Sequence, residues 1–141
     1  MKRSRRNLLT LIFLASIMLT ACDILGAGQS NPLEGSSWQL TSYRKSGLIP
    51  DTLMTANFNG GEIRGTGGCN SYFGSYSING TSLTINELGW TEMACLDPAG
   101  VMEQEQVFMS LLSTADTFSY AGEILQIITD SGEYLIFERV K

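Results

Sequence analysis

The side chains with the greatest chemical potential in this 141-residue sequence are three cysteines, Cys22, Cys69 and Cys95. A thiol can be acylated, can form a disulfide, can act as a nucleophile or can bind a metal ion. The sequence contains no histidine, which excludes Ser-His-Asp and Cys-His catalysis and also histidine-ligated zinc or copper sites. The chemistry open to each cysteine therefore depends on the segment that surrounds it.

The acidic residues show no spacing that is typical of catalysis. Glu103 and Glu105 are two positions apart, so on a helix they would point in different directions. The Gly-rich segment 65–68 lacks the lysine and the strand-to-helix transition of a phosphate-binding loop, and neither a GxSxG elbow nor a CxxC pair is present. We therefore expect no catalytic residues, no metal site and no cofactor. An enzyme that uses carboxylates or a thiol is a distant alternative.

The residues before Cys22 have the organisation of a secretory signal. A basic cluster, in which Lys2 and Arg3 are followed by Arg5 and Arg6, precedes the uncharged residues 7–21. The apolar stretch is about 14 residues long, shorter than the roughly 20 that a membrane-spanning helix needs. It ends in Leu-Thr-Ala-Cys, which resembles the lipobox cleaved by lipoprotein signal peptidase. We predict a signal peptide over residues 1–21 and a mature N-terminal Cys22 that carries fatty-acid chains such as palmitate.

Such an anchor would hold the chain at the extracytoplasmic face of a cell membrane, because several lipid chains together bind a bilayer almost permanently. We predict that residues 22–33 are the lipidated cysteine and a flexible Gly-, Ser- and Asn-containing tether, and that residues 34–141 form one domain. Without residues 1–21, five basic and 14 acidic residues are left, a net charge of −9. This charge repels phosphate backbones, so we expect no nucleic-acid partner.

Cys69 and Cys95 are an even pair once Cys22 is set aside. In an exported protein such a pair can form a lasting disulfide, which would close a loop of 25 intervening residues. That bridge would contribute roughly 3–4 kcal/mol to stability and would tie a glycine-rich turn to the start of a helix. A free redox-active pair and a metal site are the alternatives. We predict the structural disulfide.

Residues 36–93 contain short alternating apolar patterns between turn residues, which is typical of antiparallel β structure. A first strand would place Trp38 and Leu40 on one face. Asn79-Gly80 predicts a type I′ hairpin turn, because both central residues of that turn need positive φ. The further strands expected in this region are residues 53–59, 62–65, 72–78 and 82–88.

Residues 97–113 change to a helical period. Asp97 is a suitable N-cap and Pro98 suits the first helical position, so we predict a helix over about residues 98–113. Its apolar stripe, expected to pack on the sheet, comprises Val101, Gln104, Phe108, Leu111 and Leu112. Two last strands, residues 124–129 and 134–140, are apolar on both faces, which is usual for strands that are central in a sheet or covered on each face. The sheet must therefore curl around a core.

Two motifs in this chain resemble the META domain family of HslJ-like heat-shock lipoproteins. The first is GTGGCNSYFGSYSI, residues 65–78, and the second is TEMAC, residues 91–95. The resemblance covers about residues 33–140 and also includes GSSWQL at residues 35–40, three helix positions and two positions of the last strand: Glu105, Phe108, Leu112, Leu135 and Phe137. It implies an antiparallel β-rich domain with one helix, similar to the opened barrels of secretion pilot lipoproteins. It also implies a loose link to envelope stress, with no agreed activity, ligand or catalytic residue.

The predicted fold class is therefore α+β and mainly antiparallel β, with a curled or open barrel-like sheet and one amphipathic helix packed on it. As function we predict non-catalytic binding or assembly support in the cell envelope, with an envelope protein or an apolar ligand as partner. Phe108, Leu111 and Leu112 would border the site. The aromatic residues that could line it are Trp38, Tyr72, Tyr76 and Trp90. The alternative is a structural or stress-resistance lipoprotein in which all these residues are core.

Overall fold

The computed structural model describes residues 31–141. The predicted signal peptide, Cys22 and most of the predicted tether lie outside these residues. The end of the predicted tether does not, and Leu33 is fully buried. The folded unit therefore includes residues 31–33, which were predicted to belong to the tether.

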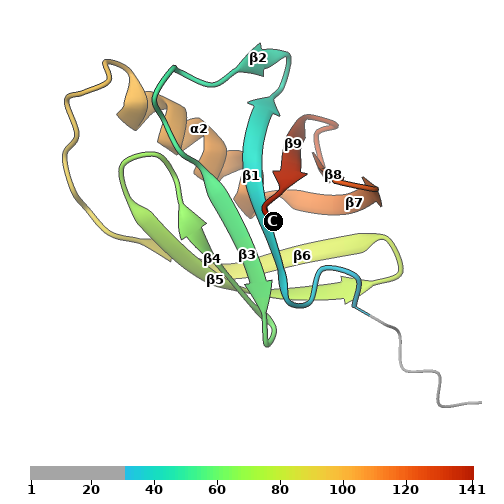
Figure 1. Cartoon of the computed structure of the whole chain (residues 1–141). Coiled ribbons are helices and arrows are strands. Elements are labelled where there is room, and N and C mark those ends of the chain that lie inside the picture. Colours follow the sequence, from blue (N-terminus) through green and yellow to red (C-terminus); the bar gives the residue numbers. More distant parts are fainter. Residues whose placement is uncertain (1–30) are drawn as a thin grey trace, which may run out of the picture. The chain divides into compact units, whose positions relative to one another are not determined.

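Within residues 31–141 the chain forms nine strands and one helix, α2 (Figure 1). The helix, Val101–Ser113, separates the sixth strand from the seventh. The strands are β1 (Ser36–Tyr43), β2 (Ser46–Gly47), β3 (Thr55–Asn59), β4 (Glu62–Thr66), β5 (Ser71–Asn79), β6 (Ser82–Trp90), β7 (Ala115–Ala121), β8 (Ile124–Thr129) and β9 (Tyr134–Arg139).

The strands follow one another as an antiparallel meander that closes on itself. Neighbours run from β1 through β3, β4, β5, β6, β7 and β8 to β9, and β9 pairs again with β1, while the two-residue β2 pairs only with β1. The closing ladder extends from Trp38 opposite Arg139 to Tyr43 opposite Leu135. The α+β, barrel-like fold class is thus confirmed, and the β1–β9 pairing makes this side of the barrel closed.

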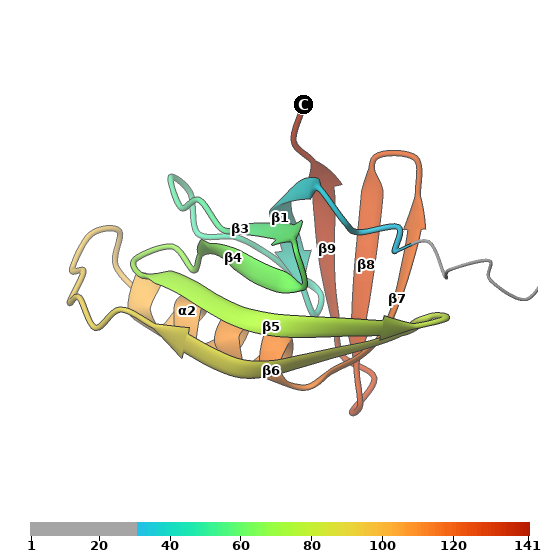
Figure 2. The same ribbon diagram turned by 90° about the horizontal axis from the view of Figure 1, so that it is seen from below.

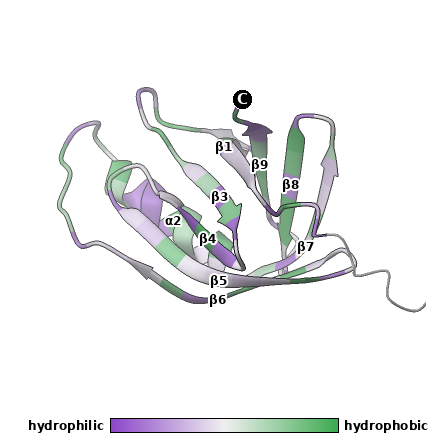
Figure 3. Ribbon diagram, turned by 60° about the horizontal axis from the view of Figure 1, so that its bottom comes forward, coloured by the Kyte–Doolittle hydropathy of each residue, from purple (hydrophilic) through white to green (hydrophobic). Residues whose placement is uncertain are grey.

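Alternation along the strands builds the core inside this barrel. In β1, Trp38 and Leu40 are buried while Gln39 and Thr41 are exposed, as the period of two requires. In β8 and β9 the buried positions also alternate, and Ile124 on the outer face is 40% exposed. Of the two predicted alternatives, the central position is confirmed, since β8 lies between β7 and β9 and β9 lies between β8 and β1; coverage of both faces is not found. Figure 3 shows β8 largely apolar although only one of its faces is buried.

The β5–β6 hairpin is present, but its turn lies one residue further along than predicted. Asn79 is opposite Ser82, so Gly80 and Thr81 are the two central residues. Gly80 has φ +62°, whereas Thr81 is not among the positive-φ residues. This is the φ pattern of a type II′ turn with glycine at its first central position. The prediction of a type I′ turn centred on Asn79-Gly80 was wrong.

Away from the β1–β9 seam, β6 and β7 pair only next to the β5–β6 turn, so the barrel has an open side beyond that pair. These two strands share a single pair, Ser82 opposite Thr117. Beyond it β6 carries a bulge, since the register with β5 shifts between Phe73 and Ser75 and Glu87 has φ +54°. A bulge bends and twists its strand, so β6 turns away from β7. Figure 2 shows α2 alongside the half of β5 and β6 that is remote from their hairpin turn.

Helix α2 starts later than predicted. Its N-cap is Gly100 with φ +86°, and no side chain caps the N-terminus. Asp97 and Pro98 lie in the preceding loop, so the prediction of Asp97 as N-cap was wrong. The C-terminus at Ser113 agrees with the prediction. The stripe that contains Phe108, Leu111 and Leu112 packs into the core.

Strand β7 was not predicted. Its sequence ADTFSYA has one buried residue, Phe118, and no alternating pattern. It is a strand because it pairs along its length with β8. Within residues 31–141, no helix has the length and apolarity required to cross a bilayer.

Candidate functional site

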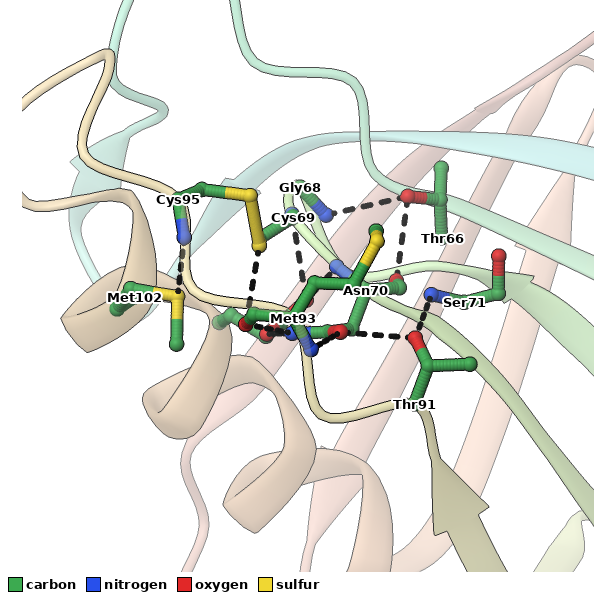
Figure 4. The surroundings of a disulfide bond; sticks show 10 residues. Thr66, Gly68, Cys69, Asn70, Ser71, Thr91, Met93, Cys95 and Met102 are labelled. Atoms are coloured by element: carbon green, nitrogen blue, oxygen red, sulfur yellow. Dashed lines mark hydrogen bonds between the residues drawn. A yellow bond between two sulfur atoms is a disulfide. The ribbon is translucent and has the colours of Figure 1, made fainter.

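The predicted disulfide between Cys69 and Cys95 is confirmed, with an S–S distance of 2.04 Å. It joins the turn after β4 to the segment that follows β6 (Figure 4). Cys95 N–H also donates to the Sδ of Met102 on α2. The bridge therefore fixes residues 91–96 between the sheet and the start of the helix.

Glu105 is the buried centre of this region, with only 5% of its surface exposed. Its Oε1 accepts hydrogen bonds from the backbone N–H of Asn70 at 2.6 Å and of Cys69 at 3.3 Å. Its Oε2 accepts from Nδ2 of Asn70 at 2.7 Å. A buried carboxylate is tolerated when such donors surround it. Glu105 thus holds the turn after β4 against α2.

Asn70 uses its whole side-chain amide in this network. Its Oδ1 accepts from the N–H of Met93 at 2.7 Å and from the hydroxyl of Thr91 at 2.8 Å. Its Nδ2 donates to the carbonyl of Met93 at 3.2 Å and to Glu105. All its donors and its acceptor are therefore satisfied. Figure 4 shows this amide between the turn that carries Cys69 and the segment that carries Thr91 and Met93.

The glycines of the first motif make this close packing possible. A Cβ on Gly67 would lie 2.6 Å from Oε1 of Glu105, and a Cβ on Gly65 would collide with the carbonyl oxygen of Thr55. Gly68 has φ +111°, a conformation that side chains disfavour. The GxGG segment is therefore explained by the space that Glu105 and the neighbouring strand need.

A cavity of about 560 Å³ lies beside this network, between α2, the last part of β6 and the segment that follows β6. The helix residues that line the cavity are three, four or seven positions apart, so they share one side of α2. The lining comprises Asn70, Leu88, Trp90, Thr91, Glu92, Met93, Ala94, Met102, Glu105, Gln106, Met109, Ser110 and Ser113. The cavity occupies the opening of the barrel that β7 leaves uncovered.

Flexible and aromatic apolar side chains dominate the cavity. Met93, Met102 and Met109 are three of the six methionines in the sequence, and unbranched methionine adapts to varied shapes. Trp90 and Met93 are 52% and 56% exposed, and nearby Leu96 is 91% exposed. Exposed large apolar side chains in one neighbourhood are typical of interaction sites.

The electrostatic environment of the cavity is acidic. Glu92 and Glu105 contribute carboxylates, and no Lys or Arg belongs to the lining. Among residues 31–141, no group of three or more Cys, Asp and Glu side chains converges as metal ligands would. The cavity is therefore suited to neutral or cationic molecules with apolar groups.

Comparison with known protein families gives a match to the META domain over residues 31–141. The chain belongs to the META domain family. No curated protein sequence matches it. Among solved structures, it is similar to a protein from Burkholderia xenovorans determined by NMR, with a TM-score of 0.65 and 27% identity over 77% of this chain and 84% of that chain.

Two more distant structures support the fold of this META domain alone. One is a protein solved by NMR, with a TM-score of 0.61 and 19% identity over 74% of this chain and 89% of that chain. The other is a DUF4847 family protein from Bacteroides vulgatus ATCC 8482, with a TM-score of 0.56 and 14% identity over 79% of this chain and 96% of that chain.

The META domain places most of the predicted binding residues in its core rather than at the cavity. Phe108, Leu111 and Leu112 are at most 2% exposed, and none of them lines the cavity. Leu111, which was predicted to border the site, therefore lies in the core. Trp38 is also fully buried and lies under the guanidinium of Arg139, 4.4 Å from its ring.

The three other predicted aromatic residues have different positions. Tyr72 is buried, its ring contacts Phe108 at a centroid distance of 5.6 Å, and its hydroxyl donates to the carbonyl of Thr55. Burial raises the pKa of Tyr72 far above its ordinary value. Tyr76 is buried at another place, where its hydroxyl meets Glu34. Of the predicted binding residues only Trp90 lines the cavity.

Sequence reasoning missed the cavity side of the helix. Met102, Gln106, Met109 and Ser113 follow one another at intervals of three or four residues, so they form a second stripe next to the core stripe. This periodicity was visible in the sequence. Its mixture of methionine with polar residues is also typical of an ordinary solvent-exposed face. Only the open side of the barrel places it opposite β6 and the segment after β6, where a cavity forms.

Proposed function

We propose that this META domain is a non-catalytic binding module that receives an apolar group in the cavity between α2 and β6. The observation that carries the proposal is the cavity itself, about 560 Å³ and lined by three methionines and the half-exposed Trp90. Small-molecule and segment-binding sites are commonly concave, mainly apolar and supplied with a few polar groups.

The polar residues at the cavity support a binding role. Glu105 accepts three hydrogen bonds from Asn70 and Cys69, and Asn70 in turn holds Thr91 and Met93. These groups are engaged in fixing one wall of the cavity. A wall that is held in place before a ligand arrives lowers the entropic cost of binding.

The predicted lipid anchor suggests where in the cell the binding module acts. We propose that Cys22 is lipidated and that the domain acts at the extracytoplasmic face of a cell membrane, as the signal that ends in Leu-Thr-Ala-Cys suggests. Mass spectrometry of membrane-extracted protein should find an acylated peptide that begins at Cys22. An intact Met1 terminus, or cleavage at another position, would contradict the anchor.

Binding can be tested with Nile red, a neutral apolar dye that the acidic cavity does not repel. The folded protein should bind the dye with enhanced emission. Ser110 is exposed and lines the cavity, so Ser110→Phe should fill the space and weaken dye binding at least tenfold. Ser77→Phe, on the exposed face of β5 away from the cavity, is the matched control and should bind like the wild type.

The outcomes separate this proposal from the structural alternative. Both variants must keep the far-ultraviolet circular dichroism spectrum and the urea midpoint of the wild type. If the folded wild type does not bind the dye, or if Ser110→Phe binds it unchanged, the cavity is not a binding site. A structural or stress-resistance lipoprotein without a ligand site would then be the better description.

A further inference from the structure

We infer that the occupant of this cavity is an extended peptide segment of a partner protein, which pairs with the free edge of β6 as an added strand. The inference rests on the proposed function, because it names the ligand class of the same cavity. Its evidence is the backbone of β6, which presents unpaired hydrogen-bonding groups on the side where the cavity lies.

The register of β5 and β6 shows which backbone groups face the cavity side. Thr91 N–H donates to the carbonyl of Ser71, and Gly89 is opposite Phe73. In an antiparallel ladder alternate residues point toward the same neighbour. The N–H and C=O groups of Gly89 and Thr91 therefore face β5, and those of Leu88 and Trp90 face away from it.

Within residues 31–141 no strand takes up these outward groups. The only pair between β6 and β7 is at Ser82, before the bulge at Glu87, and in Figure 2 α2 lies behind β5 and β6, not beside β6 as a further strand would. A helix has no free ladder to offer, because its own backbone groups are paired internally. The edge at Leu88 and Trp90 is thus a template for an incoming strand.

The dimensions of the site fit a short extended segment. The cavity side of α2 extends from Met102 to Ser113, eleven residue steps or about 16 Å at 1.5 Å per residue. A strand rises about 3.3 Å per residue, so about five residues would lie along the helix. A strand paired with β6 would present alternate side chains to Met102 and Met109, whose flexible thioethers accept different apolar shapes.

The charges around the edge of β6 indicate which charged residues the peptide segment should carry. Glu87 at the bulge and Glu92 after the strand are both exposed, and no basic residue lines the cavity. A segment with alternating apolar side chains and flanking lysine or arginine would complement this surface, whereas an acidic segment would be repelled. The partner is therefore a basic, extended, alternately apolar stretch of polypeptide.

The test uses synthetic heptapeptides with the sequence Lys-Val-Thr-Leu-Thr-Val-Lys, acetylated and amidated at the ends. In one version the amides of odd-numbered residues are N-methylated, and in the other those of even-numbered residues. Only one set can face β6, so methylation of that set should weaken binding to the folded protein at least tenfold, and methylation of the other set less than threefold. A version with glutamate in place of both lysines should bind at least fivefold more weakly at low salt.

Hydrogen exchange locates the contact. Binding of the unmodified peptide should slow the exchange of the Leu88 and Trp90 amides, and Ser110→Phe should abolish both binding and protection while Ser77→Phe preserves them. If both methylated versions bind equally, or if Nile red binds but the peptides do not, strand addition is wrong and the apolar cavity proposal still stands. If neither the dye nor the peptides bind, both proposals fail.

Discussion

The two sides of this barrel are built from the same sheet and differ in almost every other respect. At the closed seam, β9 and β1 form a ladder of five residue pairs with one irregularity between Leu40 and Ser42. The side chains of Trp38, Leu40, Leu135 and Phe137 beneath it are at most 1% exposed. At the open side, β6 and β7 share one pair, and Trp90 and Met93 are more than half exposed. Aromatic residues on the two sides therefore have different roles.

The cause of the difference is local. The bulge at Glu87 turns β6 away from β7, and the helix inserted between these two strands fills the gap only in part. The turn after β4, the disulfide and Glu105 then hold the edge of the gap. A closed ladder maximises backbone pairing and burial, whereas a supported opening leaves apolar surface for another molecule.

The largest expected effect on stability comes from replacing an aromatic residue on the closed side, and an aromatic residue on the open side serves as the comparison. Phe137→Ala removes a fully buried ring that packs against Phe108 and should lower the free energy of unfolding by about 3–5 kcal/mol. Trp90→Ala removes a ring that is 52% exposed and should cost less than about 1 kcal/mol. It should still weaken Nile red binding several-fold. Urea denaturation and dye titration measure both, and equal destabilisation would contradict the distinction between the two sides.

The disulfide tests how much the open side depends on its support. A Cys69→Ser/Cys95→Ser double variant releases a cross-link with a sequence separation of 26 and should lose about 3–4 kcal/mol of stability. Because residues 91–96 are no longer fixed, dye affinity should fall in protein that is still folded. Non-reducing peptide mapping of exported wild type should recover the linked peptides. Two free thiols there would show that the bridge is not formed.

The buried carboxylate should have a somewhat smaller effect. Glu105→Ala leaves the N–H groups of Cys69 and Asn70 without their acceptor, which should cost about 2–3 kcal/mol. Glu105→Gln keeps an acceptor oxygen at the same place and should cost less. Chemical denaturation of the two variants gives the comparison. If the alanine and glutamine variants are equally stable, the hydrogen bonds do not support the cavity wall.

The smallest expected effect is a pH dependence of stability that comes from Glu34, just before β1. Hydrogen bonds from Gly60 N–H and from the Tyr76 hydroxyl hold the pKa of Glu34 below its ordinary value of 4.5. Because the pKa is lower in the folded state, this contribution is complete above about pH 4.5 and is lost as the pH falls through the lowered pKa. Glu34→Gln should therefore flatten the acid limb of the stability profile.

The same contact predicts an alkaline effect of opposite direction. Burial, together with the hydrogen bond to Glu34, raises the pKa of Tyr76 above 10.0. Stability from the neutral hydroxyl is present below that value and is lost as the pH rises through the raised pKa. Tyr76→Phe should remove this alkaline loss. Urea midpoints from pH 3 to 11 measure both limbs, with Glu123→Gln at an exposed position as control, and an unchanged acid limb in Glu34→Gln would contradict the assignment.

The local pattern of the sequence determined much of this fold. Alternation at Trp38 and Leu40 identified a strand, the period of residues 101–113 identified the helix, and an even cysteine pair identified the bridge between Cys69 and Cys95. The strand and the helix can be predicted because their periodicity is set within a few residues. The disulfide can be predicted because Cys69 and Cys95 are the two cysteines that remain when Cys22 is set aside. The core position of Phe108 also follows from its stripe.

Tertiary structure alone decided where the barrel closes and where it opens. β7 is a strand because it pairs with β8. Its own sequence has no apolar pattern that predicts a strand, and β7 is pale in the hydropathy colouring of Figure 3. Trp90 and Phe108 look equally apolar in the sequence, yet the bulge at Glu87 and the pairing of β9 with β1 place one at the cavity and the other in the core. Burial of a residue depends on partners that are distant in sequence, and those pairings are properties of the whole sheet.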